Sequence, residues 1–252
     1  MAKGRRTPGG ILPRPRAEAR IPPRNTPLDH AQARAALVAA AQATQHAGLN
    51  RGTSGNLSVR VPGGLLVTPT GIPYERLRAT EVVLLDADGT PAPGQLRPSS
   101  EWRFHRDVLA ARPDVAAIVH THSPHATALA CLGEDLPAFH YMVAAAGGAD
   151  VRCAAYATFG TQALSDAVLA ALTDRRACLM ANHGALAVGA DLDGALALAH
   201  EVEALCQQYL LARAAGRPTL LDAAEMRNVA ARFADYGRQY PIAAPSPPGE
   251  PA

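Results

Sequence analysis

The stretch Ala117-Ile118-Val119-His120-Thr121-His122 places two histidines at the end of a short apolar, β-branched run. A run of this composition is typical of a buried strand. Side chains alternate between the two faces of a strand, so His120 and His122 are expected to point to the same side. Two imidazoles can bind one metal ion but do not complete a zinc site. The stretch therefore predicts a strand that carries part of a metal site.

A third candidate ligand follows a second short apolar run. His183 comes directly after Cys178-Leu179-Met180-Ala181-Asn182. Three histidines that leave one coordination position open are typical of a zinc ion that takes part in chemistry rather than in structure. A lone His-x-His pair is common by chance, so the hypothesis needs support from the rest of the chain.

Other histidines receive no role as ligands. Four of them lie in segments with a helical pattern or at the edges of such segments: His30, His46, His105 and His200. His125 follows the turn Ser123-Pro124, which should direct its ring off the strand face. We therefore expect His125 to pack beside the site without binding the metal.

Short strands and helices mix irregularly around the two apolar runs. The expected helices cover residues 28–47, 98–111, 124–132, 161–172, 192–214 and 222–234. The expected strands cover residues 57–61, 65–68, 81–86, 113–121, 151–154 and 177–181, the first two of which form a hairpin. Because there is no regular βαβ alternation, the pattern predicts a three-layer α/β/α sandwich on a mostly antiparallel central sheet.

Composition divides the 252-residue chain into three parts. Residues 1–27 contain six prolines and no apolar periodicity, and are expected to be a disordered basic extension. Residues 28–240 are expected to form one domain, and the proline-rich residues 241–252 a flexible tail. Residues 1–24 carry a charge of +6, so a net charge of +2 leaves −4 for the remainder. A mildly acidic domain gives no support for nucleic-acid binding.

The cysteines and the hydropathy of the chain indicate the cellular compartment in which the protein works. The chain has four widely spaced cysteines and no Cys-x-x-Cys pair, which is typical of reduced thiols in a cytoplasmic protein. No apolar segment follows the N-terminal positive charges as in a secretory signal, and none approaches the ~20 apolar residues of a membrane span. The sequence therefore predicts a cytoplasmic protein with no membrane partner.

Three loops of small polar residues accompany the histidines. They are Gly52-Thr53-Ser54-Gly55-Asn56, Thr68-Pro69-Thr70-Gly71 and Ser99-Ser100-Glu101, the last at the start of an expected helix. Their hydroxyls and backbone N–H groups could surround a phosphate dianion, although ordinary helix capping explains the two serines as well. Glu101 is a carboxylate in the first turn of the helix or, if it faces the histidines, a general acid/base or an additional ligand.

The order of these motifs resembles the zinc-dependent class II aldolase/adducin family. The motifs are Gly-Thr-x-Gly-Asn-x-Ser, Thr-Pro-Thr-Gly, Pro-Ser-Ser-Glu, His-x-His and a later His-Gly. Longer stretches, such as Pro98-Ser99-Ser100-Glu101-Trp102-Arg103-Phe104-His105 and Tyr156-Ala157-Thr158-Phe159-Gly160-Thr161, look particularly like the bacterial L-fuculose-phosphate aldolases of this family. The resemblance covers nearly all of residues 28–240.

This resemblance implies a role for each matching position. His120, His122 and His183 would bind one Zn²⁺ per subunit, with Glu101 as a further ligand and as the catalytic acid/base. The substrate phosphate would be held by Thr53, Asn56, Thr70, Gly71, Ser99 and Ser100. Tyr141 would be catalytic in the site of a neighbouring subunit, and Phe159 and Tyr236 would shape the substrate pocket. The family also implies a homotetramer with active sites at subunit interfaces.

The implied activity is that of a metal-dependent carbon–carbon lyase. Such an enzyme cleaves a ketose 1-phosphate, L-fuculose 1-phosphate or a similar 5-deoxyketose 1-phosphate, to dihydroxyacetone phosphate and a small aldehyde such as lactaldehyde. Pentulose-phosphate 4-epimerases and methylthioribulose-1-phosphate dehydratases have related metal sites and stay as alternatives. A non-catalytic adducin-like interaction domain is a further alternative, although it predicts eroded ligands and the three histidines and Glu101 are all present.

Overall fold

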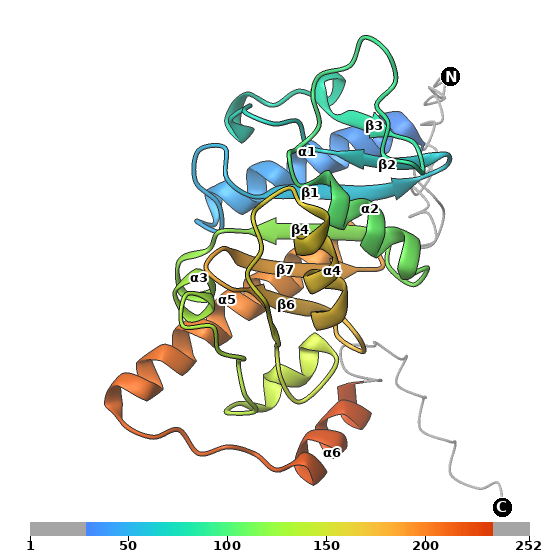
Figure 1. Ribbon diagram of the computed structural model, residues 1–252. Coiled ribbons are helices and arrows are strands. Elements are labelled where there is room, and N and C mark those ends of the chain that lie inside the picture. The colour runs from blue at the N-terminus through green and yellow to red at the C-terminus, as the bar shows by residue number, and fades with distance from the viewer. Residues whose placement is uncertain (1–28, 234–252) are drawn as a thin grey trace, which may run out of the picture.

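Strand β4 (Ala117–Thr121) forms within residues 113–121, where a strand is expected, and it lies in the middle of a seven-stranded sheet. The computed structural model describes residues 29–233, so the expected extension 1–27, the expected tail 241–252 and Tyr236 lie outside the described residues. The strand order is β3-β2-β1-β4-β7-β6-β5 (Figure 1). The strands are β1 (Asn56–Val61), β2 (Gly64–Val67), β3 (Val83–Leu85), β5 (Cys153–Ala154), β6 (Ala177–Met180) and β7 (Gly184–Gly189).

The sheet is almost wholly antiparallel. β1 and β2 form the expected hairpin, with Val61 opposite Gly64, and only β5 and β6 pair in parallel. The sequence prediction missed β7, the strand that lies between β4 and β6. Its sequence, Gly-Ala-Leu-Ala-Val-Gly, begins and ends with glycine and contains a single β-branched residue, so it lacks the usual composition of a strand.

Helices cover both faces of the sheet, which confirms the three-layer prediction (Figure 1). On one face, α1 (His30–His46), α3 (Pro124–Ala130) and α5 (Leu192–Ala215) pack on side chains that include Val119. On the other face, α2 (Trp102–Ala111) and α4 (Gln162–Ala171) pack on side chains that include Ile118. Neighbouring residues of β4 thus point to opposite layers, as the strand pleat requires.

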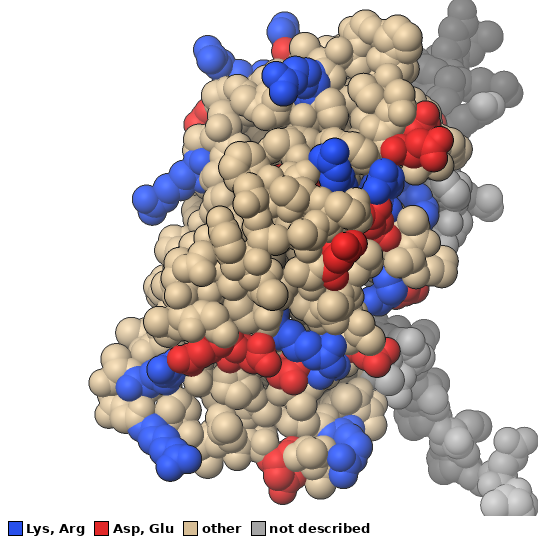
Figure 2. All heavy atoms as spheres, in the orientation of Figure 1, with Lys and Arg blue, Asp and Glu red and all other residues tan. Residues whose placement is uncertain are grey.

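Shorter elements complete the described chain. They are the 3-10 helices Tyr74–Arg76, Ala79–Glu81 and Tyr141–Ala146, and the terminal helix α6 (Ala223–Phe233). No helix within residues 29–233 combines the length and the apolar character needed to cross a bilayer. Basic and acidic side chains lie side by side on the face drawn in Figure 2, so this face presents no continuous basic surface.

Candidate active site

Strand β4 directs two histidines toward the layer that contains α2 and α4. Because side chains alternate along the strand, His120 and His122 share the face of Ile118, which packs with these helices. His120 is fully buried, and its Nδ1 lies 2.9 Å from the carbonyl oxygen of Ala185 on β7. That carbonyl can only accept, so Nδ1 of His120 carries a hydrogen, and Nε2 is the ring nitrogen that faces the other ligands.

His183 lies in the tight turn between β6 and β7. Its backbone N–H donates to the carbonyl of Met180 at 3.0 Å, and Asn182 beside it has a positive φ of 54°. A Cβ on Gly184 would stand 2.3 Å from the backbone oxygen of Thr121. Glycine therefore allows β7 to approach β4 closely enough to bring the His183 ring beside the β4 histidines.

Glu101 immediately precedes α2 and points into the histidine cluster. It occupies the N-cap position, yet its side chain makes no capping hydrogen bond. The alternative that Ser99 and Ser100 cap this helix is therefore not what the structure shows, and Ser99 Oγ accepts a hydrogen bond from the Glu101 N–H at 3.3 Å. With the backbone held in this way, the carboxylate reaches the imidazoles.

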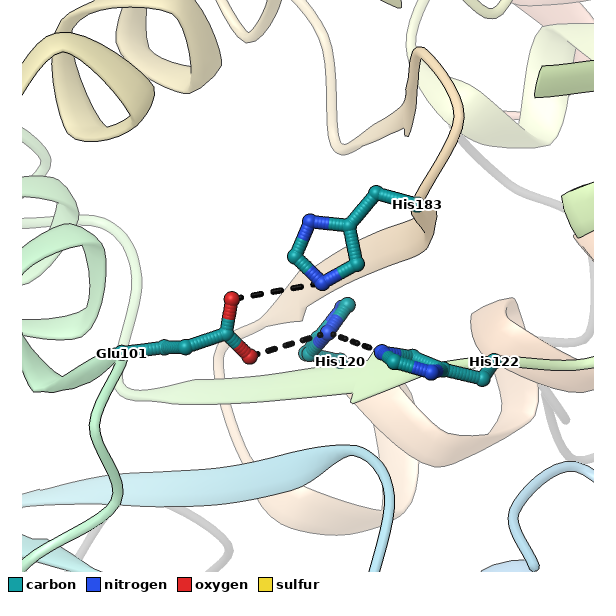
Figure 3. Close-up of side chains that lie close together, drawn as sticks. All are labelled: Glu101, His120, His122 and His183. Carbon is teal, nitrogen blue, oxygen red and sulfur yellow. Dashed lines mark hydrogen bonds and ion pairs between the residues drawn. The ribbon is translucent and has the colours of Figure 1, made fainter. Parts of the chain in front are cut away.

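The four side chains meet at one point, as Figure 3 shows. Nε2 of His120 lies 3.1 Å from Nε2 of His122 and 3.3 Å from Oε2 of Glu101, and Nε2 of His183 lies 3.3 Å from Oε1 of Glu101. Two ligands that are each about 2.0–2.1 Å from a tetrahedral zinc ion stand about 3.3 Å apart. The donor atoms, all within 4.8 Å of one another, thus have the spacing of a metal site.

The protonation states also suit a metal. Burial lowers the pKa of His122 and of His183 to about 4, so both rings are neutral near pH 7. Burial opposes ionisation of Glu101, but His120, His183 and the hydrogen bond from Asn56 outweigh it and hold the pKa of Glu101 well below its usual range. A buried Oε1 of Glu101 has no hydrogen-bond partner among the described residues, although it is close to His183. A cation would satisfy that oxygen.

Two residues that sequence reasoning missed organise the loops around this cluster. Oδ1 of the buried Asn50 accepts the backbone N–H of His122 at 3.0 Å and so fixes the end of β4. The Tyr74 hydroxyl donates to the carbonyl of Gly55 at 2.8 Å, and burial raises the pKa of Tyr74 to about 12. Tyr74 lies three residues after Gly71, the last residue of the Thr-Pro-Thr-Gly motif, and this proximity was the signal that could have found it.

A cavity of about 300 Å³ opens above the histidines. It brings together six residues predicted from sequence for the phosphate and substrate: Thr53, Asn56, Thr70, Ser99, Ser100 and Phe159. Ser54, Tyr156 and Asn182 also line it and were not predicted. A larger cavity of about 830 Å³ at the end of α5 contains none of the clustered histidines, so the smaller one is the candidate active site.

Two predicted residues lie elsewhere in the described part of the chain. Gly71 follows Thr70 but does not itself line the cavity, and Tyr141 lies outside it with 49% of its surface exposed. Phe159, at the cavity, is also unusually exposed for an aromatic residue, at 64%. His125 pairs with Glu203 at 2.7 Å and is not among the clustered ligands, as expected.

Comparison with known proteins agrees with this geometry. Residues 35–210 match the family model of the class II aldolase and adducin N-terminal domain. The chain is 52% identical over 212 residues to 5-methylthioribulose-1-phosphate/5-deoxyribulose-1-phosphate aldolase of Rhodospirillum rubrum, covering 84% of this chain and 95% of that protein. It is 50% identical over 191 residues to L-fuculose phosphate aldolase of Escherichia coli K12, covering 75% and 88%.

A solved structure supports the same relationship. The structure of an L-fuculose 1-phosphate aldolase superposes with a TM-score of 0.78 at 40% identity, covering 80% of this chain and 96% of that one. The family model spans more than half of the chain, and the curated relatives are matched over almost their whole length. The chain therefore belongs to the class II aldolase and adducin family and is an aldolase, a carbon–carbon lyase.

Proposed function

We propose that this protein cleaves a 1-phosphorylated ketose reversibly to dihydroxyacetone phosphate and a small aldehyde, with zinc as its metal. The observation that carries the proposal is the meeting of one carboxylate and three imidazoles at the floor of a cavity lined by small-residue loops. The imidazoles and the carboxylate supply nitrogen and oxygen ligands at the spacing that zinc prefers. When bound, the ion would act as a Lewis acid for negative charge that develops on the substrate oxygens.

The loops suit the phosphate group. The side chains that line the cavity include the hydroxyls of Thr53, Thr70, Ser99 and Ser100 but no lysine or arginine. A phosphate dianion would therefore be held by neutral donors and by backbone N–H groups in the loops at Asn56 and Gly71. Gly71 has a φ of 73°, a conformation in which a backbone N–H can turn toward an anion without steric cost. Anchoring the phosphate here would aim the ketose carbons at the histidine cluster.

Glu101 is the residue proposed to move protons in the reaction. It is ionised and buried, and one of its oxygens has no hydrogen-bond partner in the described structure. An acid/base must lie within reach of the reacting carbon, which the position of Glu101 beside the metal ligands provides. In the cleavage direction the carboxylate of Glu101 would first take up the proton that the C4 hydroxyl of the ketose releases, and would then deliver it to C3, the carbon that becomes the hydroxymethyl group of dihydroxyacetone phosphate.

Tyr141 is proposed to act on a neighbouring subunit. It is half exposed and does not line the cavity of its own chain, so a catalytic role there requires a second copy. A cyclic homotetramer, as implied by the family resemblance, would bring a Tyr141 hydroxyl to each cavity and place it near the departing aldehyde. Tyr236, outside the described residues, is proposed for the same pocket.

The substrate is proposed to end in an apolar carbon opposite to its phosphate. The relatives named above act on L-fuculose phosphate or on 5-deoxyribulose and 5-methylthioribulose 1-phosphates, whose far ends carry a methyl or methylthio group. Tyr156 and Phe159 both line the cavity and are both more than 60% exposed, so both can contact such a group. The free cysteines of the chain fit the cytoplasmic location that we propose.

A coupled assay for dihydroxyacetone phosphate tests the proposal. L-fuculose 1-phosphate, 5-deoxyribulose 1-phosphate and 5-methylthioribulose 1-phosphate are each incubated with the zinc-loaded parent protein and with a Glu101→Gln variant. We expect release from at least one ketose and a loss of about 100-fold or more in the variant. Release from none would refute the aldolase. Loss of substrate without release of dihydroxyacetone phosphate would favour the dehydratase alternative. Interconversion of pentulose phosphates would favour the epimerase alternative.

A further inference from the structure

His105 is a buried ionisable side chain that the proposed reaction does not use. It lies on α2 and is 0% exposed, although the sequence pattern gave it no role. Burial lowers the pKa of His105 to about 3, so the ring is neutral at physiological pH. A neutral imidazole has one donor and one acceptor nitrogen, and burial requires both to be satisfied.

Both ring nitrogens of His105 contact strand β1. Nδ1 lies 2.7 Å from the hydroxyl of Ser58, and Nε2 lies 2.5 Å from Oδ1 of Asn56. Asn56 and Ser58 are two residues apart on β1 and so share a face, while Glu101 and His105 are four apart, about one helical turn. Asn56 continues the chain of contacts, because its Nδ2 donates to Oε2 of Glu101 at 2.8 Å.

The donors and acceptors of Ser58, His105, Asn56 and Glu101 allow only one direction for the hydrogen bonds that connect them. Oδ1 of Asn56 can only accept, so Nε2 of His105 must carry the hydrogen, and Nδ1 must accept from the hydroxyl of Ser58. Each group therefore donates toward Glu101, which as a carboxylate can only accept. If the amide of Asn56 turned over, its oxygen would face that carboxylate and its NH₂ would face the Nε2–H of His105. Donation by His105 opposes this turn.

We propose that His105 is a positioning residue that acts through Asn56 to hold Glu101 against the metal ligands. The hydrogen bond from Asn56 fixes Oε2 of Glu101, 3.3 Å from Nε2 of His120, and leaves Oε1 without a hydrogen-bond partner among the described residues. One oxygen is thus anchored and the other is available to the metal or to a proton. This proposal rests on the proposed function of Glu101. It adds His105 to the site as a residue that would touch neither the metal nor the substrate.

Replacing His105 by glutamine or by asparagine tests the two contacts of its ring separately. In His105→Gln the terminal amide reaches about as far as Nε2 and can still donate to Asn56. In His105→Asn the amide ends near the position of Nδ1 and can keep only the contact with Ser58. Both remove the ring from the same buried position, so they should lower the melting temperature similarly. Ser58→Ala removes the hydroxyl contact alone and serves as a control.

Zinc affinity, measured by competition with a chromophoric chelator, is the first readout. Partners behind a metal ligand typically change affinity or activity by 10–100-fold, so we expect zinc binding to weaken about 10-fold in His105→Asn and by less than about 3-fold in His105→Gln and Ser58→Ala. The turnover number should fall in the same order, while KM for the ketose phosphate stays near the parent value. A purely structural role would affect His105→Asn and His105→Gln alike.

A double-mutant cycle tests the route through Asn56. If His105 acts through that amide, adding His105→Asn to Asn56→Ala should change zinc affinity by less than about 2-fold. Additive losses, or equal zinc affinity in His105→Asn, His105→Gln and the parent, would overturn the proposal. If His105→Asn does not fold, a cycle of His105→Phe with Asn56→Ala gives the same comparison. Because zinc affinity needs no substrate, these outcomes stay readable even if no ketose is cleaved.

Discussion

At the scale of single residues, close packing between strands explains why a glycine, Gly184, follows His183. The backbone oxygen of Thr121 lies 2.3 Å from where a Cβ on Gly184 would stand, while the φ of Gly184 lies outside the left-handed region. The constraint is therefore the closeness of β4 and β7 and not backbone conformation. A side chain at this position would have to push β7, and His183 with it, away from His120 and His122.

Gly184→Ala is predicted to damage both stability and metal binding. Overpacking of this kind typically costs about 1–3 kcal/mol, and the displaced His183 should weaken zinc affinity by about 10-fold or more. Urea unfolding and chelator competition measure the two effects. Gly216→Ala is the control, because no atom lies within 4 Å of its added Cβ and Gly216 adjoins the end of α5. Equal behaviour of the two variants would contradict the packing argument.

A pH dependence of stability follows from His105. Burial lowers its pKa from 6.5 to about 3, so between these values the unfolded chain binds a proton that the folded chain does not. Stability should be full above pH 6.5 and should fall as the pH drops, with a contribution of up to about 1.4 kcal/mol per pH unit. His105→Gln should flatten this slope. Urea unfolding of the zinc-free proteins between pH 7 and 4.5 measures it, and parallel slopes would contradict the assignment.

At the scale of elements, local patterns predicted each α-helix of residues 29–233 and every strand of the sheet except β7. The β-branched run 117–121 and the Pro-Gly-Gly turn of the hairpin at 62–64 have their own signals, and both predictions are confirmed. β7 has no such signal, because its glycines answer to tertiary neighbours: a Cβ on Gly184 would stand 2.3 Å from the backbone oxygen of Thr121, and a Cβ on Gly189 would stand 2.6 Å from the backbone nitrogen of Ala195. His105 was missed for a related reason: its partner Asn56 is 49 residues away in sequence, and helical spacing cannot reveal a polar contact across layers.

The four candidate metal ligands were predictable from local pattern only in part. His120 and His122 are related by strand alternation, which is local, whereas the approach of Glu101 and His183 follows from the tertiary fold. Only the resemblance to a family connected those distant positions before the structure did. The serines before Glu101 show the limit of local rules, since their composition fits a helix cap that the structure does not form.

Helix α3 depends on a carboxylate from α5. Glu203 accepts the backbone N–H groups of His125 at 3.0 Å and Ala126 at 2.8 Å, and it pairs with the His125 ring. Glu203→Gln removes the charge and leaves one acceptor oxygen for these donors, so we predict a loss of about 1–3 kcal/mol in unfolding free energy. Glu201→Gln, on the same helix, is the matched control. Similar urea midpoints for both variants would show that the contact does not stabilise α3.

At the scale of the whole molecule, the position of Tyr141 is informative. It begins the 3-10 helix Tyr141–Ala146 and is half exposed, whereas Glu101 is buried beside the metal ligands. The two residues proposed for catalysis therefore do not meet in one chain: Glu101 lines the cavity and Tyr141 does not. If both serve one reaction, each site must combine two subunits, and a defect in one subunit can be compensated by its neighbour.

Subunit complementation is the last prediction. Glu101→Gln and Tyr141→Phe should each be nearly inactive alone. When they are co-expressed with different tags and hybrids are purified through both, sites that join an intact Glu101 to an intact Tyr141 should reappear. In the proposed cyclic tetramer, random assembly followed by selection for both tags makes about two sevenths of the sites intact, so about 30% of parental turnover should return. Mixing the purified homo-oligomers without subunit exchange is the control. Hybrids with no more activity than that mixture would mean that one chain supplies both residues, or that Tyr141 has no part in the reaction.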